Sequence, residues 1–190
     1  IALHGFPEFW RGMTAPVLAL ARAGFRVVAP DQRGYGTSEK PEGIDAYRIE
    51  EISADAAGLV AALGRDRAFV VGHDWGAAVA WWLALTRPDL VERLVVANVP
   101  HPSVFAREVK GNRKQLRKSW YIFAIQAPWL PERLAFGKRT RGRFARMIAQ
   151  TGNPGSFDAR YLEQLEDAWS HPGAGTGMMN WYRASVRRRP

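Results

Sequence analysis

Short apolar runs alternate with amphipathic stretches through the first half of the chain. We expect strands where apolar residues are continuous over only a few positions, at residues 1–3, 26–29, 68–71 and 94–97. We expect helices where apolar residues recur at helical spacing, at residues 9–23, 49–63 and 77–86. Strands that alternate with helices over short connections predict an α/β fold, with a parallel sheet and helices on both of its faces.

The pattern changes after residue 97. Residues 98–102 form a polar junction with two prolines, and no convincing strand follows it. We expect helices separated by Gly and Pro at residues 113–125, 131–149, 158–169 and 178–188. The chain is therefore predicted to divide into an α/β part, residues 1–99, and an all-helical part, residues 100–190.

The composition is that of a globular protein. Of the 190 residues, 47% are hydrophobic, which is enough for one core with a small appended module. The chain has no cysteine, which excludes disulfides and thiolate metal sites and suits a reducing compartment. No run of about 18 apolar residues could span a membrane. The apolar start has neither Met nor a charged leader, so we expect the true start upstream and a cytoplasmic location.

The net charge of +9 is concentrated in the second half. Residues 100–190 carry 17 Lys and Arg against 6 Asp and Glu, whereas residues 1–99 carry 10 against 12. Such asymmetry can mark a surface for nucleic acid or anionic membrane. Because the basic residues are spread over several segments and fit no nucleic-acid motif, we favour solvated outer faces of helices and expect no nucleic-acid partner.

The sequence Gly72-His73-Asp74-Trp75-Gly76 joins an expected strand to an expected helix. A sharp strand-to-helix turn needs glycine two residues to either side of its centre, because side chains there would clash. Such a turn lifts the central side chain above the carboxyl edge of the sheet, where open α/β sheets bind ligands. Asp74 could instead be an ordinary helix N-cap, but the paired glycines favour a nucleophile elbow.

Aspartate at the centre of an elbow changes the chemistry from that of the usual serine. A carboxylate is already ionised at neutral pH and attacks without help from a base. It can displace a leaving group at saturated carbon and so form an alkyl ester. We therefore predict that Asp74 is a nucleophile toward saturated carbon, and a poor choice for hydrolysing peptides or esters.

The stretch from His4 to Glu8 follows the first expected strand. In the elbow architecture, backbone N–H groups stabilise the negative charge that acyl-type intermediates place on oxygen. One donor is the residue after the nucleophile, Trp75, and the other comes from this loop, where we assign it to Phe6. A cis peptide bond before Pro7 would fix the turn.

Three motifs resemble those of α/β-hydrolase-fold epoxide hydrolases of the soluble and bacterial type. They are His-Gly-Phe-Pro-Glu-Phe-Trp at 4–10, Asp-Gln-Arg-Gly-Tyr-Gly-Thr-Ser at 31–38 and Gly-His-Asp-Trp-Gly at 72–76. The resemblance covers essentially the whole chain. It implies that residues 1–99 are a partial α/β-hydrolase core, truncated at both ends, and that residues 100–190 are a helical cap, or lid, inserted after the sixth strand of the core.

The resemblance also implies a role for two cap tyrosines. Epoxide opening needs an acid near the leaving oxygen, and a phenol is neutral at pH 7 and can donate a hydrogen bond there. The family places two tyrosines over its nucleophile. The matching motifs are residues 119–121, with Gln126 five residues further on, and residues 180–183, so the assignment falls on Tyr121 and Tyr182.

Each tyrosine also has a plainer interpretation. Leu116, Trp120 and Phe123 recur at helical spacing, so their helix could bury an aromatic face and leave Tyr121 in the core with its hydroxyl bonded. Two tyrosines in matching motifs, together with the elbow, favour the catalytic interpretation. The remaining tyrosines lack such context and are assigned no role: Tyr35, Tyr47 and Tyr161.

The four histidines do not complete a catalytic triad. His4 and His73 belong to the motifs and are expected to be structural, His101 lies in a turn between two prolines, and His171 lies in a cap loop. In the family, the general-base histidine and its acid partner follow the cap, which places both beyond Pro190. The chain has no metal-ligand spacing, Walker loop or dinucleotide fingerprint, so we expect no metal and no cofactor.

These residues together predict an epoxide hydrolase that adds water to an apolar epoxide and yields a vicinal diol. Asp74 attacks a ring carbon while Tyr121 and Tyr182 hydrogen-bond the ring oxygen. The N–H groups of Phe6 and Trp75 then hold the oxyanion while the ester is hydrolysed. Because the base is expected outside the chain, the chain by itself should stop at the ester.

Three alternatives remain. A haloalkane or haloacid dehalogenase uses the same fold and the same aspartate, but haloalkane dehalogenases commonly carry Asn at the position of Phe6, and fluoroacetate-type enzymes commonly carry Arg at that of Trp75. The others are a non-catalytic binding protein on this fold and a basic nucleic-acid binder. Asp74 and the two cap tyrosines favour the enzyme, and the sequence indicates no oligomeric state.

Overall fold

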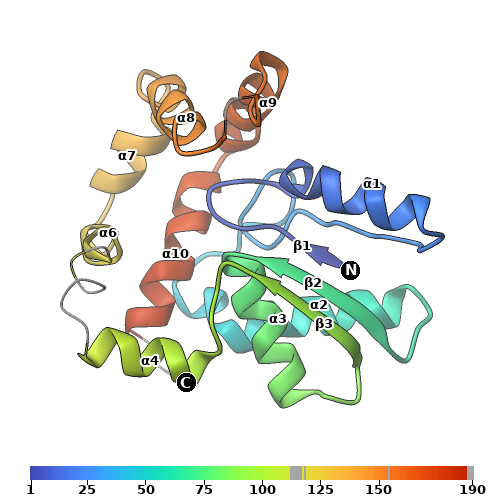
Figure 1. Ribbon diagram of the computed structural model, residues 1–190. Coiled ribbons are helices and arrows are strands. Elements are labelled where there is room, and N and C mark those ends of the chain that lie inside the picture. The colour runs from blue at the N-terminus through green and yellow to red at the C-terminus, as the bar shows by residue number, and fades with distance from the viewer. Residues whose placement is uncertain (112–116, 118, 154, 188–190) are drawn as a thin grey trace.

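The sheet at the centre of the molecule has three parallel strands. A computed structural model describes residues 1–111, 117, 119–153 and 155–187. The strands are β1 (Ala2–Leu3), β2 (Ala68–His73) and β3 (Val91–Ala97), hydrogen-bonded in the order β1-β2-β3. Parallel pairing puts the carboxyl ends of the strands at one edge, where Asp74 follows β2 (Figure 1).

The helices expected in the first part form close to their expected positions. They are η1 (Trp10–Met13) with α1 (Thr14–Arg22), α2 (Ile49–Ala62) and α3 (Trp75–Thr86), and one short helix that was not expected, η2 (Asp45–Tyr47), lies directly before α2. Gly24 and Gly64 follow α1 and α2 with φ of 89° and 67°, a conformation that glycine adopts at little cost and that ends helices. The expected α/β architecture is confirmed.

The strand expected at residues 26–29 is wrong. This segment runs beside β1, and the Ala2 N–H donates to the Val28 carbonyl at 2.8 Å, but the segment is not a strand. Its neighbour β1 is only two residues long, so there is little backbone for a ladder to pair with. The apolar pattern correctly predicted that this segment runs along the sheet, but it does not record the backbone hydrogen bonds that define a strand.

The core forms where α3 covers the sheet. Its sequence is apolar on all sides, and Val79, Ala80 and Leu83 are fully buried against strands and α2. In Figure 1, α2 and α3 lie on one side of the strands and α1 on the other. Helix α3 is therefore held rigidly beneath the residue that precedes it, Asp74.

Helices make up the second part of the chain as the structure describes it. They are α4 (Pro102–Gly111), α6 (Trp120–Ala124), α7 (Leu130–Phe136), α8 (Arg141–Ala149), α9 (Ala159–Ser170) and α10 (Ala174–Arg187). Helix α4 was not expected. It begins after His101, whose Nδ1 accepts the Ser103 N–H at 3.2 Å, so this histidine caps a helix rather than sitting in a simple turn.

Two of the expected helices differ from those observed. Residues 131–149 are two helices and not one, because the chain is extended at Gly137 and the Thr140 hydroxyl donates to the Gly137 carbonyl at 3.1 Å. The helix expected at 113–125 is described only in part: 112–116 and 118 lie outside the described residues, and α6 begins at Trp120.

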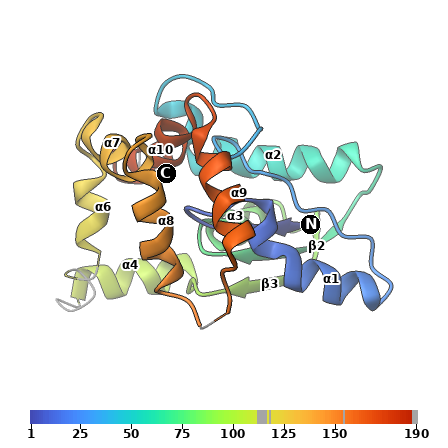
Figure 2. The same cartoon turned by 90° about the horizontal axis from the view of Figure 1, so that it is seen from above.

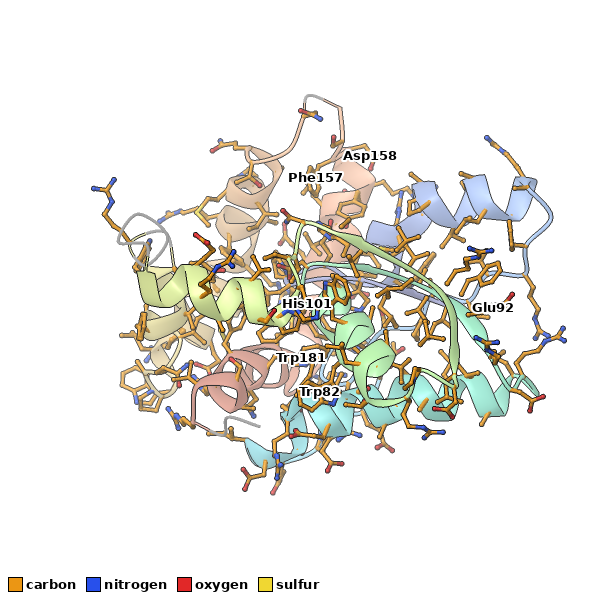
Figure 3. All side chains as sticks on the ribbon, turned by 60° about the horizontal axis from the view of Figure 1, so that its bottom comes forward. Trp82, Glu92, His101, Phe157, Asp158 and Trp181 are labelled. Atoms are coloured by element: carbon orange, nitrogen blue, oxygen red, sulfur yellow. The ribbon has the colours of Figure 1, made fainter. Side chains whose placement is uncertain are left out.

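Helices α6 to α10 lie beyond the carboxyl ends of β2 and β3, and α10 runs alongside the core (Figures 1 and 2). Trp181 on α10 reaches the core, where its ring centroid lies 5.6 Å from that of Trp75 (Figure 3). The division at residue 99 into core and cap stays a prediction.

Within the described ranges, every helix is too short or too polar to cross a lipid bilayer.

Candidate active site

Asp74 stands at a sharp turn between β2 and α3. Its backbone has φ of 51° and ψ of −123°, a strained conformation for any residue other than glycine. A Cβ at Gly72 would overlap the carbonyl of Gly76, and a Cβ at Gly76 would overlap that of Leu3. Both glycines are therefore needed for the turn, as the spacing predicts for an elbow.

The loop after β1 holds one oxygen of the Asp74 carboxylate. The Phe6 N–H donates to Asp74 Oδ1 at 2.8 Å, and a Cβ at Gly5 would overlap the aspartate side chain. The Phe6–Pro7 peptide bond is cis, as predicted. One carboxylate oxygen is thus fixed by the loop, in the position where the carbonyl oxygen of an ester on Asp74 would stand. Trp75, the other predicted donor, is the first residue of α3, where N–H groups have no partner within the helix.

His4 fixes the shape of this loop and is not a base. Its Nδ1–H donates to the Gly5 carbonyl at 3.1 Å, and its Nε2 accepts the Gln32 N–H at 3.1 Å. The Gln32 side chain donates in return to the His4 carbonyl at 2.6 Å. Burial lowers the pKa of His4 to about 4, so the ring is neutral at pH 7 and both nitrogens are occupied. The structural role expected for His4 agrees with this geometry.

Tyr182 lies beside both predicted oxyanion residues. Its ring centroid is 5.0 Å from that of Phe6 and 5.0 Å from that of Trp75, and its side chain is only 4% exposed. Burial raises the pKa of Tyr182 well above its usual value, and the negative charge of Asp74 acts in the same direction. The phenol therefore keeps its proton and remains a hydrogen-bond donor at neutral pH.

Tyr121 faces the same site from α6. Its ring centroid lies 5.9 Å from that of Tyr182, and its pKa is raised by burial and then by the charge of Asp74. The plainer interpretation of this helix is wrong, because Trp120 and Phe123 are 66% and 58% exposed and Tyr121 itself is 42% exposed. Leu116 lies outside the described residues. The two phenols, predicted from distant motifs, are neighbours.

Polar contacts join the helices that carry the two tyrosines. The Gln126 side chain donates to the Tyr182 carbonyl at 3.2 Å. The buried Arg183 donates to the Ile125 carbonyl at 3.1 Å and to Glu132 at 2.6 Å. Gln126 was noted only for its spacing, and the clamp formed by Arg183 was not foreseen, because its acceptors are more than 50 residues away in the chain.

The other histidines are engaged elsewhere. His73 Nδ1 is 3.9 Å from Glu8 Oε2. His101, at the junction of β3 and α4 (Figure 3), lies with its ring centroid 5.0 Å from that of Trp81. His171 ends α9 as its C-cap and borders a surface hollow. None of these contacts joins a histidine to the Asp74 carboxylate.

Two surface hollows lie away from Asp74. One, of about 290 Å³, is bordered by Asp31, Arg33 and Asp55, and the other, of about 390 Å³, by Trp129, Arg133 and other residues of the helical part. Neither is bordered by Asp74 or by the two tyrosines. We therefore locate the site by its chemistry, at the strained carboxylate among aromatic rings, rather than by the size of a hollow.

The α/β-hydrolase fold family profile matches residues 1–138. The chain belongs to the α/β-hydrolase fold family. Its residues are 44% identical over 184 positions to the AB hydrolase superfamily protein YfhM of Bacillus subtilis (strain 168), covering 97% of this chain and 64% of that protein. They are 42% identical over 132 positions to epoxide hydrolase 1 of Caenorhabditis elegans, covering 70% of this chain and 32% of that one.

Solved structures of other hydrolases of this family have the same fold. The Bacillus megaterium epoxide hydrolase in complex with an inhibitor superposes with a TM-score of 0.85 at 29% identity, over 96% of this chain and 63% of that one. Epoxide hydrolase A of Mycobacterium thermoresistibile superposes with a TM-score of 0.84 at 31% identity, over 98% and 67%. The chain thus spans from about a third to two thirds of the length of these four relatives.

Proposed function

We propose that this α/β hydrolase acts on epoxides, with Asp74 as a carboxylate nucleophile. The observation that carries the proposal is the grouping of the Asp74 carboxylate with two phenols. The Phe6 N–H holds Asp74 at 2.8 Å, the Tyr182 ring lies 5.0 Å from that of Phe6, and the Tyr121 ring lies 5.9 Å from that of Tyr182. The charge of Asp74 also helps to raise the pKa of both phenols. A carboxylate has only acceptor oxygens and can attack a carbon atom, whereas a phenol donates a hydrogen bond to an oxygen atom. Together they can act on the two atoms of one carbon–oxygen bond.

The first step forms an ester between Asp74 and the substrate. Because the Phe6 N–H holds Oδ1, the free oxygen Oδ2 attacks a ring carbon of the epoxide. The carbon–oxygen bond of the ring breaks, its electron pair goes to the ring oxygen, and Tyr121 and Tyr182 stabilise that oxygen by donating hydrogen bonds. Ring strain is released in the same step. One of the two phenols passes its proton to the ring oxygen and regains one from solvent, so the product is a hydroxyalkyl ester.

The second step hydrolyses this ester. Water adds to the ester carbon of Asp74, and the carbonyl oxygen becomes an oxyanion at the position now occupied by Oδ1, where the Phe6 N–H lies 2.8 Å away. The Trp75 N–H at the start of α3 supplies the second donor. Collapse returns the carboxylate and releases the diol. A base must take the proton from the attacking water.

The names of the relatives favour an epoxide oxygen over a halide as the leaving group. Epoxide hydrolases of Caenorhabditis elegans, Homo sapiens and Mus musculus are among the proteins that match. The buried phenol of Tyr182 suits an alkoxide, which needs a proton, better than a halide, which needs none. The aromatic surroundings suit an apolar substrate.

Product analysis of the protein that contains these residues tests the proposal. We expect the diol from an apolar terminal epoxide such as styrene oxide, and no chloride release from a 1-chloroalkane of similar size. The Asp74→Asn variant, which keeps the shape of the side chain and suits the positive φ, is the control and should form no diol. Halide release without diol formation would favour the dehalogenase and refute the epoxide.

A further inference from the structure

Helix α9 places two hydrogen-bond donors on the loop that carries Phe6. The Tyr161 hydroxyl donates to Glu8 Oε1 at 2.9 Å, and the Trp169 indole N–H donates to the Pro7 carbonyl at 2.6 Å. Donors and acceptors are more than 150 residues apart in sequence. Both aromatic side chains are buried, with 7% and 3% exposed, so the bonds are shielded from water.

The first turn of α9 fixes where Tyr161 stands. Asp158, at the start of this helix in Figure 3, caps it by accepting the Tyr161 N–H at 2.6 Å. The Tyr161 ring packs against those of Phe9 and Phe157, with centroids 5.8 and 5.3 Å apart. The hydroxyl is therefore aimed at Glu8 by a capped helix end and by packing.

The other end of α9 fixes Trp169 in the same manner. Its ring centroid lies 5.3 Å from that of Phe136 on α7 and 5.4 Å from that of Phe144 on α8. Leu165, fully buried, lies between the two donors along the helix. The three cap helices thus hold both donors as one packed unit.

The bonded loop residues come directly after Phe6. The loop is closed on itself by the Glu8 N–H, which donates to the Gly5 carbonyl at 3.0 Å. A shift of the Pro7 carbonyl or of Glu8 must therefore move the peptide of Phe6, whose N–H holds Asp74 Oδ1 at 2.8 Å. Burial, and then the charge of Glu8, raises the pKa of Tyr161, so its hydroxyl remains a donor.

We propose that Tyr161 and Trp169 are positioning residues, through which α9 sets the Phe6 N–H on the nucleophile. The inference rests on the proposed function of Asp74 and deepens it. It assigns a role to Tyr161, which stands in no recognised motif. With both bonds in place, Oδ1 is held and Oδ2 is free to attack. Without them, the carboxylate rotates more freely and a smaller share of encounters leads to reaction.

The test is the rate at which an excess of styrene oxide forms an ester on the protein, followed by mass spectrometry over a range of epoxide concentrations. Tyr161→Phe and Trp169→Phe each remove one donor and keep an aromatic ring. We expect the maximal rate of ester formation to fall about fivefold in each, the effect of one hydrogen bond, with the half-saturating concentration unchanged.

Two further variants separate positioning from simple loss of stability. Val60→Ala removes packing at a fully buried position of α2 but keeps both hydrogen bonds, so its maximal rate should stay within twofold of wild type at a temperature well below unfolding. Glu8→Gln keeps an oxygen for the Tyr161 hydroxyl and should stay within about threefold, whereas Glu8→Met should behave as Tyr161→Phe does. Equal rates in wild type, Tyr161→Phe and Trp169→Phe, or an equal loss in Val60→Ala, would overturn the inference.

Hydrogen exchange at the Phe6 amide, measured by NMR, makes the result independent of the chemistry. Tyr161→Phe and Trp169→Phe should exchange this amide at least threefold faster than wild type, and Val60→Ala should not. If wild type forms no ester, the proposed function fails, and unchanged exchange in the two variants would overturn the positioning role separately.

Discussion

The Asp74 side chain projects above the sheet because its backbone has a conformation that few residues tolerate. With φ of 51°, it stands clear of the sheet between glycines that allow close approach of the neighbouring chain. This was predictable from residues 72–76 alone, because steric rules act locally. The closeness of the Phe6 N–H to the Asp74 carboxylate was predictable from topology. Both residues follow parallel strands, and the carboxyl ends of such strands meet at one edge of the sheet.

At the same scale, the contacts of Tyr161 and Trp169 with the loop that carries Phe6 could not be predicted from the sequence. Both side chains read as ordinary core aromatics on an amphipathic helix, and their acceptors lie more than 150 residues away. Two side chains that meet only through tertiary packing leave no pattern in the spacing of a single sequence. Tyr182 and Tyr121 were found because their motifs resemble a known family, and their mutual contact came only from the structure.

Removing the phenol hydroxyls should slow ester formation. Tyr182→Phe and Tyr121→Phe are each expected to lower the rate about tenfold, because one donor remains, and the double variant should lower it at least about a hundredfold. Time courses of ester formation with styrene oxide measure the effect. Tyr47→Phe, at a buried tyrosine outside the site, is the control. A double variant that reacts as fast as wild type would exclude the phenols from the chemistry.

The phenols also set an alkaline limit. Burial raises the pKa of Tyr182 above its usual value of about 10, and that of Tyr121 is raised as well, so both donors stay protonated below that pH and lose their protons only above it. The rate of ester formation should therefore be level from about pH 7 to 9.5 and decline only at pH above about 10. A pH–rate profile that declines through about pH 8 would contradict the assignment.

At the scale of elements, the sequence predicted helices better than strands. The helix at 49–63 was clear because its apolar residues recur every third or fourth position, whereas the helix at 77–86, apolar on all sides, was expected from its place after the elbow. The segment at 26–29 was misread because a strand is defined by its pairing as well as by its apolar residues. The break between α7 and α8 was missed because the Thr140 hydroxyl, which bonds the last turn of α7, competes with helix geometry in a way that periodicity does not record.

The cap of α9 gives a test of local stability. Asp158→Ala removes the acceptor for the Tyr161 N–H and should lower the free energy of unfolding by about 1 kcal/mol. Urea unfolding measures the change. Asp158→Asn, which keeps an acceptor oxygen, should lose much less. Loss of the same free energy in both variants would show that charge, and not the hydrogen bond, stabilises this helix end.

At the scale of the whole molecule, the α/β part and the helical part are arranged in the way that the proposed site needs. Helices α6 to α10 stand over the carboxyl ends of the strands (Figure 2), where the Tyr182 ring packs against that of Trp75 and the Tyr121 ring against that of Tyr182. The periodicity predicted both parts, but which helix faces which strand follows from side-chain packing and hydrogen bonds between distant segments. The resemblance supplied what the periodicity lacked.

The central claim is that Asp74 attacks the substrate and carries it as an ester. Incubation of the 190-residue chain with styrene oxide, followed by peptide mapping, measures this directly. We predict one adduct of the mass of the epoxide, located on Asp74 and absent from Asp74→Asn. An unmodified Asp74 after prolonged incubation of the folded chain, or an adduct that forms equally in Asp74→Asn, would contradict the account.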